Sequence, residues 1–435
     1  MARPAASPVR VAILSLLFNW PSTGGGTVHT AETGKFLARA GYDVKHFYAQ
    51  YADWKVGNVN LSLEIPSLAI AFETADWNAF EIQRRFRDAV DRFEPDYVII
   101  TDSWNFKPLL AEAVRGYRYF LRLAAQECLC PLNNVRLLVD EQGRPSACPR
   151  HQLATSGACR RCVGQRQHQS GNLHQAERKL AGYGTADYDE KLRRTFAEAE
   201  AVLAVNPLIA AAVGPYAKAV HVVPSGFDPD RFPCPFEFPP LSKGGAGGVA
   251  PLRTTITSNT QPHRLRIFFA GLVDEYMKGF RVLHAACARL WEKRQDFELI
   301  ATSDPPGQVN PMTRFIGWQP QSELPKHIRQ ADFLVFPTIA EEALGRSAVE
   351  AMGVGRPVIA SRIGGLPFTV IDELTGLLFE PGNVCDLAEK IETLLDDAEL
   401  RHRLGRAGRR RFEEHFIWNV IIDKHYRKLL TPIRV

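Results

Sequence analysis

The sequence predicts an α/β protein with two parallel-sheet domains, and two observations carry this prediction. Short apolar runs alternate with amphipathic helical stretches in both halves of the chain, a pattern typical of parallel β-α-β units. Between the halves, residues 234–263 are rich in proline and glycine and show neither a helical nor a strand period, as expected of a linker or a disordered insertion. A chain of 435 residues is long enough for two such domains.

The expected elements alternate in order along the chain. Before the break, the expected strands are 9–17, 44–49, 97–101, 119–123, 201–205 and 220–223, and the expected helices are 30–40, 81–93 and 188–200. After it, the alternation resumes at Leu265 with the apolar runs IFFAG, FELIATS, FLVFPT, PVIAS and GLLFEP, separated by helices that include 280–293 and 386–395. A last helix is expected over 406–430. Because open parallel sheets bind ligands at the carboxyl ends of their strands, two facing sheets would leave a binding cleft between the domains.

Charge and hydropathy narrow the class of partner and the compartment. The formal net charge of +5, from 53 basic and 48 acidic residues, argues against nucleic acid and leaves room for anionic ligands or a membrane surface. The apolar run 11–18 is too short to span a bilayer, and no small-residue cleavage site follows it. We therefore expect a cytoplasmic protein. The basic stretch 401–411 could contact anionic phospholipid at the inner face of the membrane, and a solvated helix face is the alternative.

Two loops that follow strands are candidates for phosphate binding. Gly24, Gly25 and Gly26 precede a helix, so their amides and the positive end of that helix could face an anion. The glycine spacing matches no phosphate-binding fingerprint, and a flexible turn is the alternative. In the second half, Lys278 stands at the start of a helix, where its ammonium group would suit a phosphate.

The stretch EEALGRSAVEAMG places two carboxylates, Glu342 and Glu350, after a predicted strand. On one continuous helix they would lie about 12 Å apart along the axis, with their side chains about 80° apart. This exceeds the roughly 5–9.5 Å between the two carboxyl groups of glycosidases. Two contacts to separate parts of one polyhydroxylated ligand fit better than a hydrolytic pair.

Five of the eight cysteines lie between positions 128 and 162. In a reducing compartment such clustering favours a structural metal, usually zinc held by four thiolates. The expected ligands are Cys130, Cys148, Cys159 and Cys162, with Cys128 or His151 as a replacement for one of them. An iron–sulfur cluster, free thiols and a redox pair are the alternatives.

Six segments, in order, resemble one known family, the family-4 retaining glycosyltransferases of the GT-B fold. They are STGGGTVHTAETGKFLARAGYDV, VVPSGFDPDRF, AGLVDEYMKGF, ADFLVFPT, IAEEALGRSAVEAMGVGRPVIASRIGG and LTGLLFEPGN. The resemblance covers all but the linker and the middle of the first domain. It implies two Rossmann-like domains: an acceptor-side domain over 1–233 with a Cys-rich insertion at 126–165, and a nucleotide-sugar-binding domain over 264–410. A C-terminal helix over 411–435 would cross back to the first domain.

The same resemblance implies roles for individual residues. The substrate would be a UDP- or GDP-type sugar donor, and Glu350 would bind its ribose. The catalytic residues would be Glu342, which contacts the transferred sugar, and Lys278, which contacts the diphosphate. The backbone of Ala343, Leu344 and Gly345 would assist Glu342, and the amides of Gly25 and Gly26 would face the diphosphate. The family needs no catalytic metal. A subset of it carries a similar Cys-rich insertion, which supports the four-thiol set.

The sequence departs from the family pattern at four positions. Leu272 replaces an arginine that pairs with Lys278, and Arg281 or Arg346 could substitute for it. Ala124 or Ala125 stands where a histidine is usual, Phe368 replaces a glutamate, and Leu344 replaces an aromatic residue. These changes keep open two alternatives: an atypical or non-catalytic, metal-stabilised protein that binds sugar nucleotides or RNA, and a phosphorylase of the same fold.

Three residues of the first half are candidates for acceptor contact. His29 lies in the glycine-rich segment, and Asp102 and Trp104 follow the strand YVIIT at the ligand-bearing edge of the sheet. An incidental helix-start histidine and a simple helix cap are the alternatives.

Overall fold

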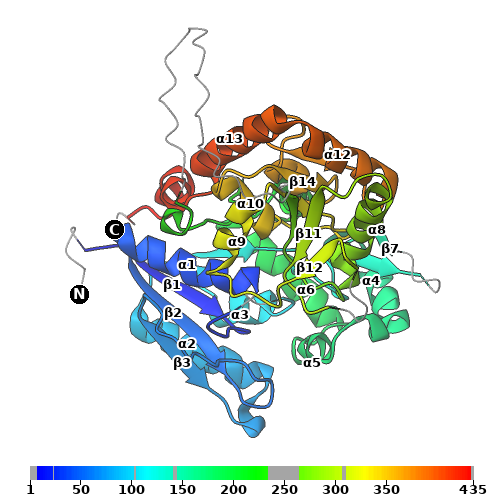
Figure 1. Ribbon diagram of the computed structural model, residues 1–435. Coiled ribbons are helices and arrows are strands. Elements are labelled where there is room, and N and C mark those ends of the chain that lie inside the picture. The colour runs from blue at the N-terminus through cyan, green and yellow to red at the C-terminus, as the bar shows by residue number, and fades with distance from the viewer. Residues whose placement is uncertain are drawn as a thin grey trace.

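The computed structural model describes residues 7–22, 24–101, 104–140, 145–233, 264–305 and 310–432, and it contains two parallel sheets (Figure 1). The first sheet has the strand order β3-β2-β1-β4-β5-β8-β9, and every pairing in it is parallel. Its strands are β1 (Arg10–Ser15), β2 (Asp43–Gln50), β3 (Ser67–Ala71), β4 (Tyr97–Ile100), β5 (Tyr119–Leu123), β8 (Ala201–Ala204) and β9 (Val220–Val222).

The second sheet repeats this architecture with six strands in the order β12-β11-β10-β13-β14-β15, again all parallel. Its strands are β10 (Leu265–Phe269), β11 (Phe297–Ala301), β12 (Thr313–Phe315), β13 (Phe333–Phe336), β14 (Val358–Ser361) and β15 (Leu377–Phe379). The central strands are buried along their length, as the unbroken apolar runs predict. The predicted α/β class with two Rossmann-like parallel-sheet domains is therefore confirmed.

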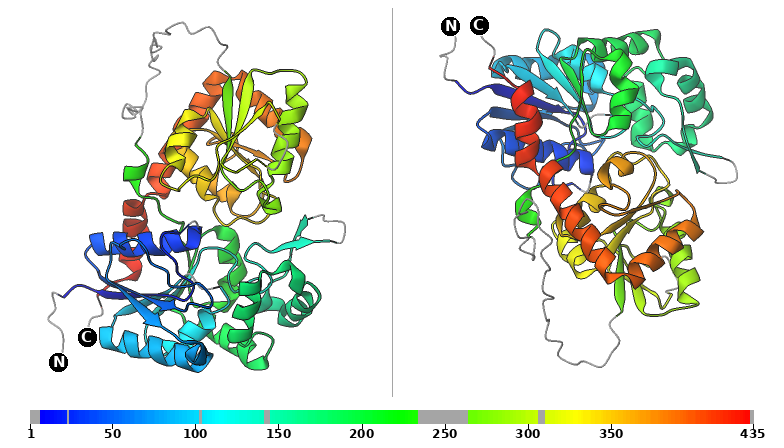
Figure 2. Two further views of the ribbon diagram at one scale, coloured as in Figure 1. Left: turned by 60° about the horizontal axis from the view of Figure 1, so that its bottom comes forward. Right: turned by 90° about the horizontal axis from the view of Figure 1, so that it is seen from above.

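Helices cover both sheets (Figure 2). Those of the first domain are α1 (Gly25–Arg39), α2 (Ala79–Phe93), α3 (Lys107–Ala113), α4 (Gln152–Gln165), α5 (Asn172–Leu180), α6 (Ala186–Glu198) and α7 (Pro207–Val213). Those of the second are α8 (Phe280–Trp291), α9 (Leu324–Gln330), α10 (Arg346–Gly353), α11 (Leu366–Thr369), α12 (Val384–Asp396) and α13 (Ala398–His415). No helix within the described ranges is long and apolar enough to cross a membrane.

Three sequence-based expectations differ from the structure. Helix α1 begins at Gly25 instead of residue 30, because the glycine segment itself enters the helix. The edge strand β3, only partly buried, was not predicted, although residues 68–72 form an apolar run. The expected helix over 406–430 is interrupted: α13 ends at His415, and α14 (Trp418–Ile421), a π-helical turn (Ile422–Tyr426) and α15 (Arg427–Leu429) follow. The expected linker at 234–263 lies outside the described residues.

The interruption has a clear cause in the backbone hydrogen bonds of Phe227. The amide of Phe227 donates to the carbonyl of Phe416 at 2.8 Å, and the amide of Trp418 donates to the carbonyl of Phe227 at 3.2 Å. Beyond this bridge the chain packs on the first domain, where Trp418, Ile421 and Tyr426 share a buried cluster with strands β1 and β4. The C-terminal segment thus ties the second domain to the first (Figure 2).

A small antiparallel hairpin lies in the Cys-rich insertion, formed by β6 (Leu137–Val139) and β7 (Pro145–Ala147). Helix α4 follows it and carries the Cys-x-x-Cys sequence. The loop that leads into the hairpin, around Asn134 and Val135, faces the space between the domains.

Candidate functional site

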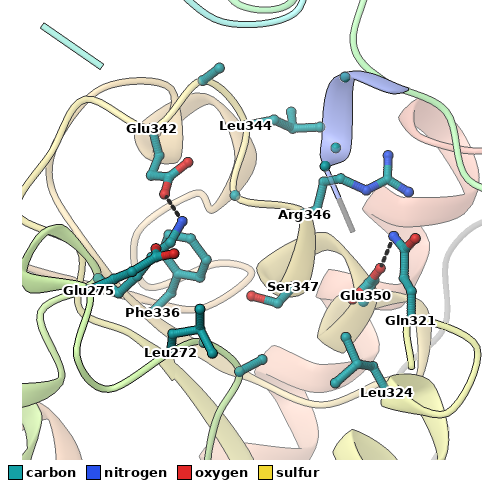
Figure 3. A pocket seen from close by; sticks show the side chains of 18 of the residues that line it. Leu272, Glu275, Gln321, Leu324, Phe336, Glu342, Leu344, Arg346, Ser347 and Glu350 are labelled. Carbon is teal, nitrogen blue, oxygen red and sulfur yellow. Dashed lines mark hydrogen bonds and ion pairs between the residues drawn. The ribbon is translucent and has the colours of Figure 1, made fainter. Parts of the chain in front are cut away.

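A cleft of about 590 Å³ lies between the two domains at the carboxyl ends of their strands. The first domain contributes small or uncharged residues: Gly24, Gly25, Gly26, Ala124, Ala125, Asn134, Val135 and Ser225. The second domain contributes most of the charge, with Glu275, Lys278, Glu342, Arg346 and Glu350 among its lining residues. Figure 3 shows Glu342 and Glu350 reaching into this cleft on either side of Ser347.

The glycine segment forms the N-terminal end of α1, and all three of its glycines line the cleft. The helix has 15 residues, so its first amides present a positive end to this space. A side chain at Gly25 would place its Cβ 2.9 Å from Cδ of Arg346. The absence of a side chain there lets the arginine of the second domain approach the start of α1.

Lys278 and Glu342 form an ion pair across the cleft wall, with 2.7 Å between Nζ and Oε1 (Figure 3). Burial disfavours the charged lysine, but the charge and the hydrogen bond of Glu342 outweigh burial and raise the pKa of Lys278. The lysine is placed by Gly279, which has φ +72° and whose Cβ would lie 1.8 Å from the carbonyl oxygen of Pro337. The ammonium group is therefore held in its charged form at a fixed place.

The segment from Glu342 to Gly345 is a loop between β13 and α10. The carbonyl of Glu342 accepts a hydrogen bond from the amide of Gly365 at 2.7 Å. Gly345 adopts φ +75° directly before α10, a conformation that favours glycine. The loop therefore presents Glu342 outside the helix that carries Glu350, so the two carboxylates belong to different elements.

Glu350 lies within α10 with 1% of its surface exposed. Its Oε1 accepts a hydrogen bond from Nε2 of Gln321 at 3.4 Å. Burial raises the pKa of Glu350, although the charges of Arg346 and Arg231 and the hydrogen bond of Gln321 act in the opposite direction. A buried carboxylate with one weak partner is well suited to accept hydrogen bonds from a ligand's hydroxyl groups.

Arg346 is the least satisfied cation of the site. Its three guanidinium nitrogens are buried and have no hydrogen-bond partner among the described residues. The guanidinium lies 4.3 Å from the ring centroid of Phe227 and 3.9 Å from the carboxylate of Glu32. Leu272 lines the same cleft and is 44% exposed. An anionic ligand would supply the partners that Arg346 lacks.

Two candidate acceptor residues, His29 and Trp104, pack against other aromatic rings and do not line the cleft. His29 is buried, and its ring stacks on Trp418 at a centroid distance of 5.2 Å; burial, with Arg122 and Arg346 nearby, lowers its pKa well below the usual range. Trp104 stacks on His174 at 3.5 Å. Neither is among the lining residues of the cleft, and Asp102 lies outside the described residues.

The cysteines Cys130, Cys148, Cys159 and Cys162 line one separate cavity of about 210 Å³. Within the described ranges, however, no three His, Cys, Asp or Glu side chains are arranged to hold one metal ion. Cys128 points elsewhere, since its thiol donates to the carbonyl of Trp104 at 3.1 Å. The four expected ligands thus share a cavity without forming a finished metal site.

Sequence reasoning did not single out several cleft residues, among them Asn134, Ser225, Thr302, Trp318 and Gln321. Thr302 directly follows β11, so its position at a strand end was a usable signal. Trp318 and Gln321 lie in a loop after β12 that carries no motif.

Part of the chain matches known proteins in sequence. Residues 258–411, most of the second domain, match the family described as glycosyl transferases group 1. Over 221 residues the chain is 33% identical to the 2-deoxystreptamine glucosyltransferase of Streptomyces kanamyceticus, a match that covers 48% of this chain and 54% of that protein. Over 161 residues it is 32% identical to a D-inositol 3-phosphate glycosyltransferase of Corynebacterium kroppenstedtii, covering 33% and 35% of the two chains. The matches thus span about half or less of these relatives' length.

Solved structures resemble the whole chain. Sucrose-phosphate synthase from Thermosynechococcus elongatus superposes with a TM-score of 0.63 at 19% identity and covers 97% of this chain and 99% of its own. The Anabaena protein HepE, solved in complex with UDP and glucose, gives 0.61 at 14% identity, covering 98% and 100%. At these identities the likeness establishes the fold, which is GT-B, and the second domain carries the sequence of the group 1 glycosyltransferases.

Proposed function

We propose that the protein is a retaining glycosyltransferase of the family-4 type that moves a sugar from a nucleoside-diphosphate sugar to an acceptor. One observation supports this most strongly: Lys278, Glu342, Arg346, Glu350 and the start of α1 all border a single interdomain cleft. The Anabaena relative in fold was solved with UDP-glucose, which favours a UDP-type donor in this chain. The second domain would hold the donor.

Each element of the cleft has a part in this proposal. Glu350 accepts hydrogen bonds from the ribose hydroxyls, and Glu342 does the same for the transferred sugar. Lys278, Arg346 and the amides of Gly25 and Gly26 surround the diphosphate. Fixed cations and amide dipoles stabilise the charge that develops on the diphosphate as the sugar leaves.

The chemistry that fits a retaining transfer proceeds on one face of the sugar. The bond from the anomeric carbon to the phosphate oxygen breaks, and the acceptor oxygen bonds to the same face. The acceptor proton passes to the departing phosphate, so no side chain of this chain is required as the base. The acceptor would approach along the first-domain wall formed by Ala124, Ala125, Asn134, Val135 and Ser225.

The decisive experiment is a panel of nucleotide sugars incubated with the purified protein, with nucleotide release and direct binding both measured. We expect binding and turnover of at least one donor, retention of anomeric configuration in the product, and activity that survives removal of divalent metal. Wild-type turnover matched by Glu342→Ala would contradict the proposal, as would the absence of any donor binding.

Two other activities are distinguished by the same panel. A phosphorylase would release sugar 1-phosphate from a glycan when inorganic phosphate is added. A binding protein would retain a sugar nucleotide or RNA without turnover. Three of the charged groups in the cleft, Lys278, Glu342 and Glu350, favour the transferase, since binding alone does not require a cation fixed beside the sugar site.

We also propose that the Cys-rich insertion binds a structural metal, zinc or an iron–sulfur cluster, through Cys130, Cys148, Cys159 and Cys162. The shared cavity supports this, but the four sulfurs would have to draw closer for a tetrahedral site. Burial raises the pKa of Cys130 to about 11, and metal binding would have to overcome this preference for the thiol.

Metal analysis of the protein purified without chelators tests this idea. About one zinc per chain, lost in Cys159→Ser/Cys162→Ser, is the expected result, while visible absorbance together with iron would indicate a cluster. The change Cys385→Ser, at an exposed thiol on the second domain, is the matched control. Metal-free protein with four titratable thiols and unchanged stability would overturn the assignment.

Peripheral membrane contact is proposed for the exposed basic face of α13, which includes Arg403, Arg406 and Arg410. Co-sedimentation with vesicles of anionic phospholipid, compared with neutral vesicles, tests it. Equal sedimentation with both would contradict an electrostatic attachment.

A further inference from the structure

The loop from Glu341 to Leu344 belongs to the second domain but is held in place by groups of the first. The second of its four residues is the catalytic candidate Glu342, whose side chain pairs with Lys278. The residues on both sides of Glu342 instead contact the first domain.

Asn206 holds the loop from one side. The side chain is 1% exposed, and its Nδ2 donates to the carbonyl of Ala343 at 2.6 Å. Its Oδ1 accepts from the amide of Ile209 at 2.9 Å and so caps the start of α7. A Cβ at Gly365 would lie 1.9 Å from the same carbonyl oxygen and 2.7 Å from Nδ2. The glycine therefore leaves the space that this hydrogen bond occupies.

Arg136 and Gln126, from the Cys-rich insertion, hold the loop from the other side. Nη1 of Arg136 lies 3.6 Å from Oε2 of Glu341, and the two side chains are 13% and 18% exposed. Nε2 of Gln126 donates to the same oxygen at 3.4 Å. Partial burial makes such a pair stronger than one on the open surface.

Arg136 is itself fixed by the cysteine-bearing strand. Its carbonyl accepts from the amide of Cys148 at 2.8 Å, and its Nη2 donates back to the carbonyl of Cys148. The backbone at Arg136 has φ +51°, which is uncommon outside glycine and is sustained by such surroundings. The position of the guanidinium thus depends on the folded insertion.

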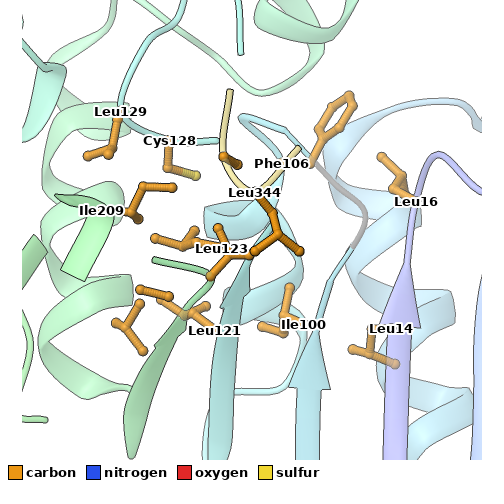
Figure 4. Close-up of a cluster of buried hydrophobic side chains, with 14 of the residues drawn as sticks. Leu14, Leu16, Ile100, Phe106, Leu121, Leu123, Cys128, Leu129, Ile209 and Leu344 are labelled. Atoms are coloured by element: carbon orange, nitrogen blue, oxygen red, sulfur yellow. The ribbon is translucent and has the colours of Figure 1, made fainter. Parts of the chain in front are cut away.

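Leu344 completes the attachment. It is 4% exposed and belongs to the apolar cluster that includes Ile100, Leu123 and Leu129 at the end of the first sheet. Figure 4 shows Leu344 among these first-domain side chains. Burying the leucine side chain stabilises this contact, so the loop is anchored where polar contacts alone would be weak.

We propose that Asn206, Arg136 and Gln126 are positioning residues that fix Glu342 from the first domain, so that the Cys-rich insertion contributes to the sugar part of the donor site. The inference rests on the proposed function, since it assigns Glu342 to the transferred sugar. Glu350 and Arg346 lie on α10, so the nucleotide half of the donor would keep these two contacts if the loop shifted, whereas Lys278 pairs with Glu342 itself. Because a displacement of about 1 Å can reduce turnover about 100-fold, a small shift of the loop would be measurable.

Two substitutions test this while keeping the surrounding fold. Asn206→Asp retains an oxygen to cap α7 but turns a carboxylate oxygen toward the carbonyl of Ala343. Arg136→Gln removes the charge beside Glu341. The controls are Asn78→Asp, which makes the same change at the cap of α2, and Arg150→Gln, at an exposed arginine of the same insertion.

Turnover of UDP-glucose is expected to fall by about 10- to 100-fold in both variants, whereas the Kd for UDP changes by less than about twofold. Both controls should match the wild type. Equal losses of UDP and UDP-glucose affinity would indicate a general structural role and overturn the proposal. Turnover within twofold of the wild type would do the same.

A second measurement separates this proposal from the proposed function. If the wild-type protein uses no UDP-glucose, the loop is followed by hydrogen exchange of the amides at 341–345. Exchange should be faster in Asn206→Asp and in Arg136→Gln than in the two controls. Unchanged exchange would show that the first domain does not hold the loop.

Discussion

At the scale of single residues, Glu350 shows a conflict between stability and binding. The carboxylate is almost fully buried and accepts one long hydrogen bond, from Gln321. Its ionised form is therefore poorly solvated in the free protein, and burial raises its pKa. A group in this condition weakens the fold and is retained where a ligand needs it.

Glu350→Gln is expected to stabilise the protein at neutral pH and to weaken donor binding by about 10- to 100-fold. The folded protein holds the proton of Glu350 more tightly than the unfolded chain does. The stability penalty is therefore absent below the unfolded pKa, grows as pH rises toward the raised folded pKa, and is complete above it. Thermal unfolding of both proteins from pH 4 to 8 measures the difference. A gap that narrows as pH rises would contradict this sign.

Replacing Arg346 is also expected to weaken donor binding without destabilising the fold. Arg346→Met keeps the packing on Phe227 but removes a guanidinium that has no hydrogen-bond partner within the described chain. Donor affinity should fall at least about 10-fold. The free energy of unfolding should change little, because the buried guanidinium has only a 3.9 Å ion pair with Glu32 and no hydrogen bond among the described residues. Binding by calorimetry and urea denaturation check the two parts. Arg346→Lys should recover only part of the affinity, since it lacks the planar fork.

At the scale of elements, the C-terminal segment after α13 packs against the core of the first domain. Trp418 is fully buried, stacks on His29 and Phe36, and donates from Nε1 to Glu32 at 3.0 Å. A Cβ at Gly226 would lie 2.3 Å from the Trp418 ring. This close approach of backbone and ring shows that the segment is an integral part of the first domain's core.

Trp418→Ala is expected to reduce the free energy of unfolding by about 3–5 kcal/mol. The loss combines a large cavity with removal of the hydrogen bond from Trp418 to Glu32. Chemical denaturation followed by circular dichroism measures it. Trp318→Ala, at a tryptophan that is 56% exposed, is the control and should change stability by less than about 0.5 kcal/mol. Similar losses in both would show that the C-terminal segment does not support the core.

At the scale of the whole molecule, the two domains are joined by more than the chain connection. One apolar cluster contains side chains from both domains, among them Phe232 of the first domain and Leu344 and Phe412 of the second. Arg409 on α13 donates to the carbonyl of Phe232 at 2.6 Å and also to the carbonyl of Gly353. Its guanidinium thus links the end of the first domain to α10, the helix that carries Glu350.

Arg409→Met is expected to lower the free energy of unfolding by roughly 2–4 kcal/mol, because two buried carbonyls lose their donor. The unfolding transition should also broaden or separate into two steps as the domains become less strongly coupled. Arg406→Met, at an exposed position on the same helix, should have little effect. A single, unshifted transition in Arg409→Met would contradict this linking role.

The sequence by itself determined the fold class and most of the cleft. Apolar runs in the sequence predicted the strands, because strands buried on both faces are rich in apolar residues. The strand predicted at Tyr119–Leu123 has the same bounds in the structure. Glu342, Glu350, Lys278 and the glycine segment were predicted from strand ends and motifs, and the structure places all of them on one cleft.

Only the tertiary structure decided which residues act across the domain boundary. Nothing near Asn206 or Gln126 in the sequence indicates a contact with a residue 137 or 215 positions away. Nothing near Leu344 indicates a place among apolar side chains of the other domain. It also decided that His29 packs against Trp418 and that the guanidinium of Arg346 has no hydrogen-bond partner in the part of the chain that the structure describes. The local sequence pattern indicates periodicity and turns, which are properties of neighbouring residues. Contacts between the domains instead depend on how the two folded sheets pack together.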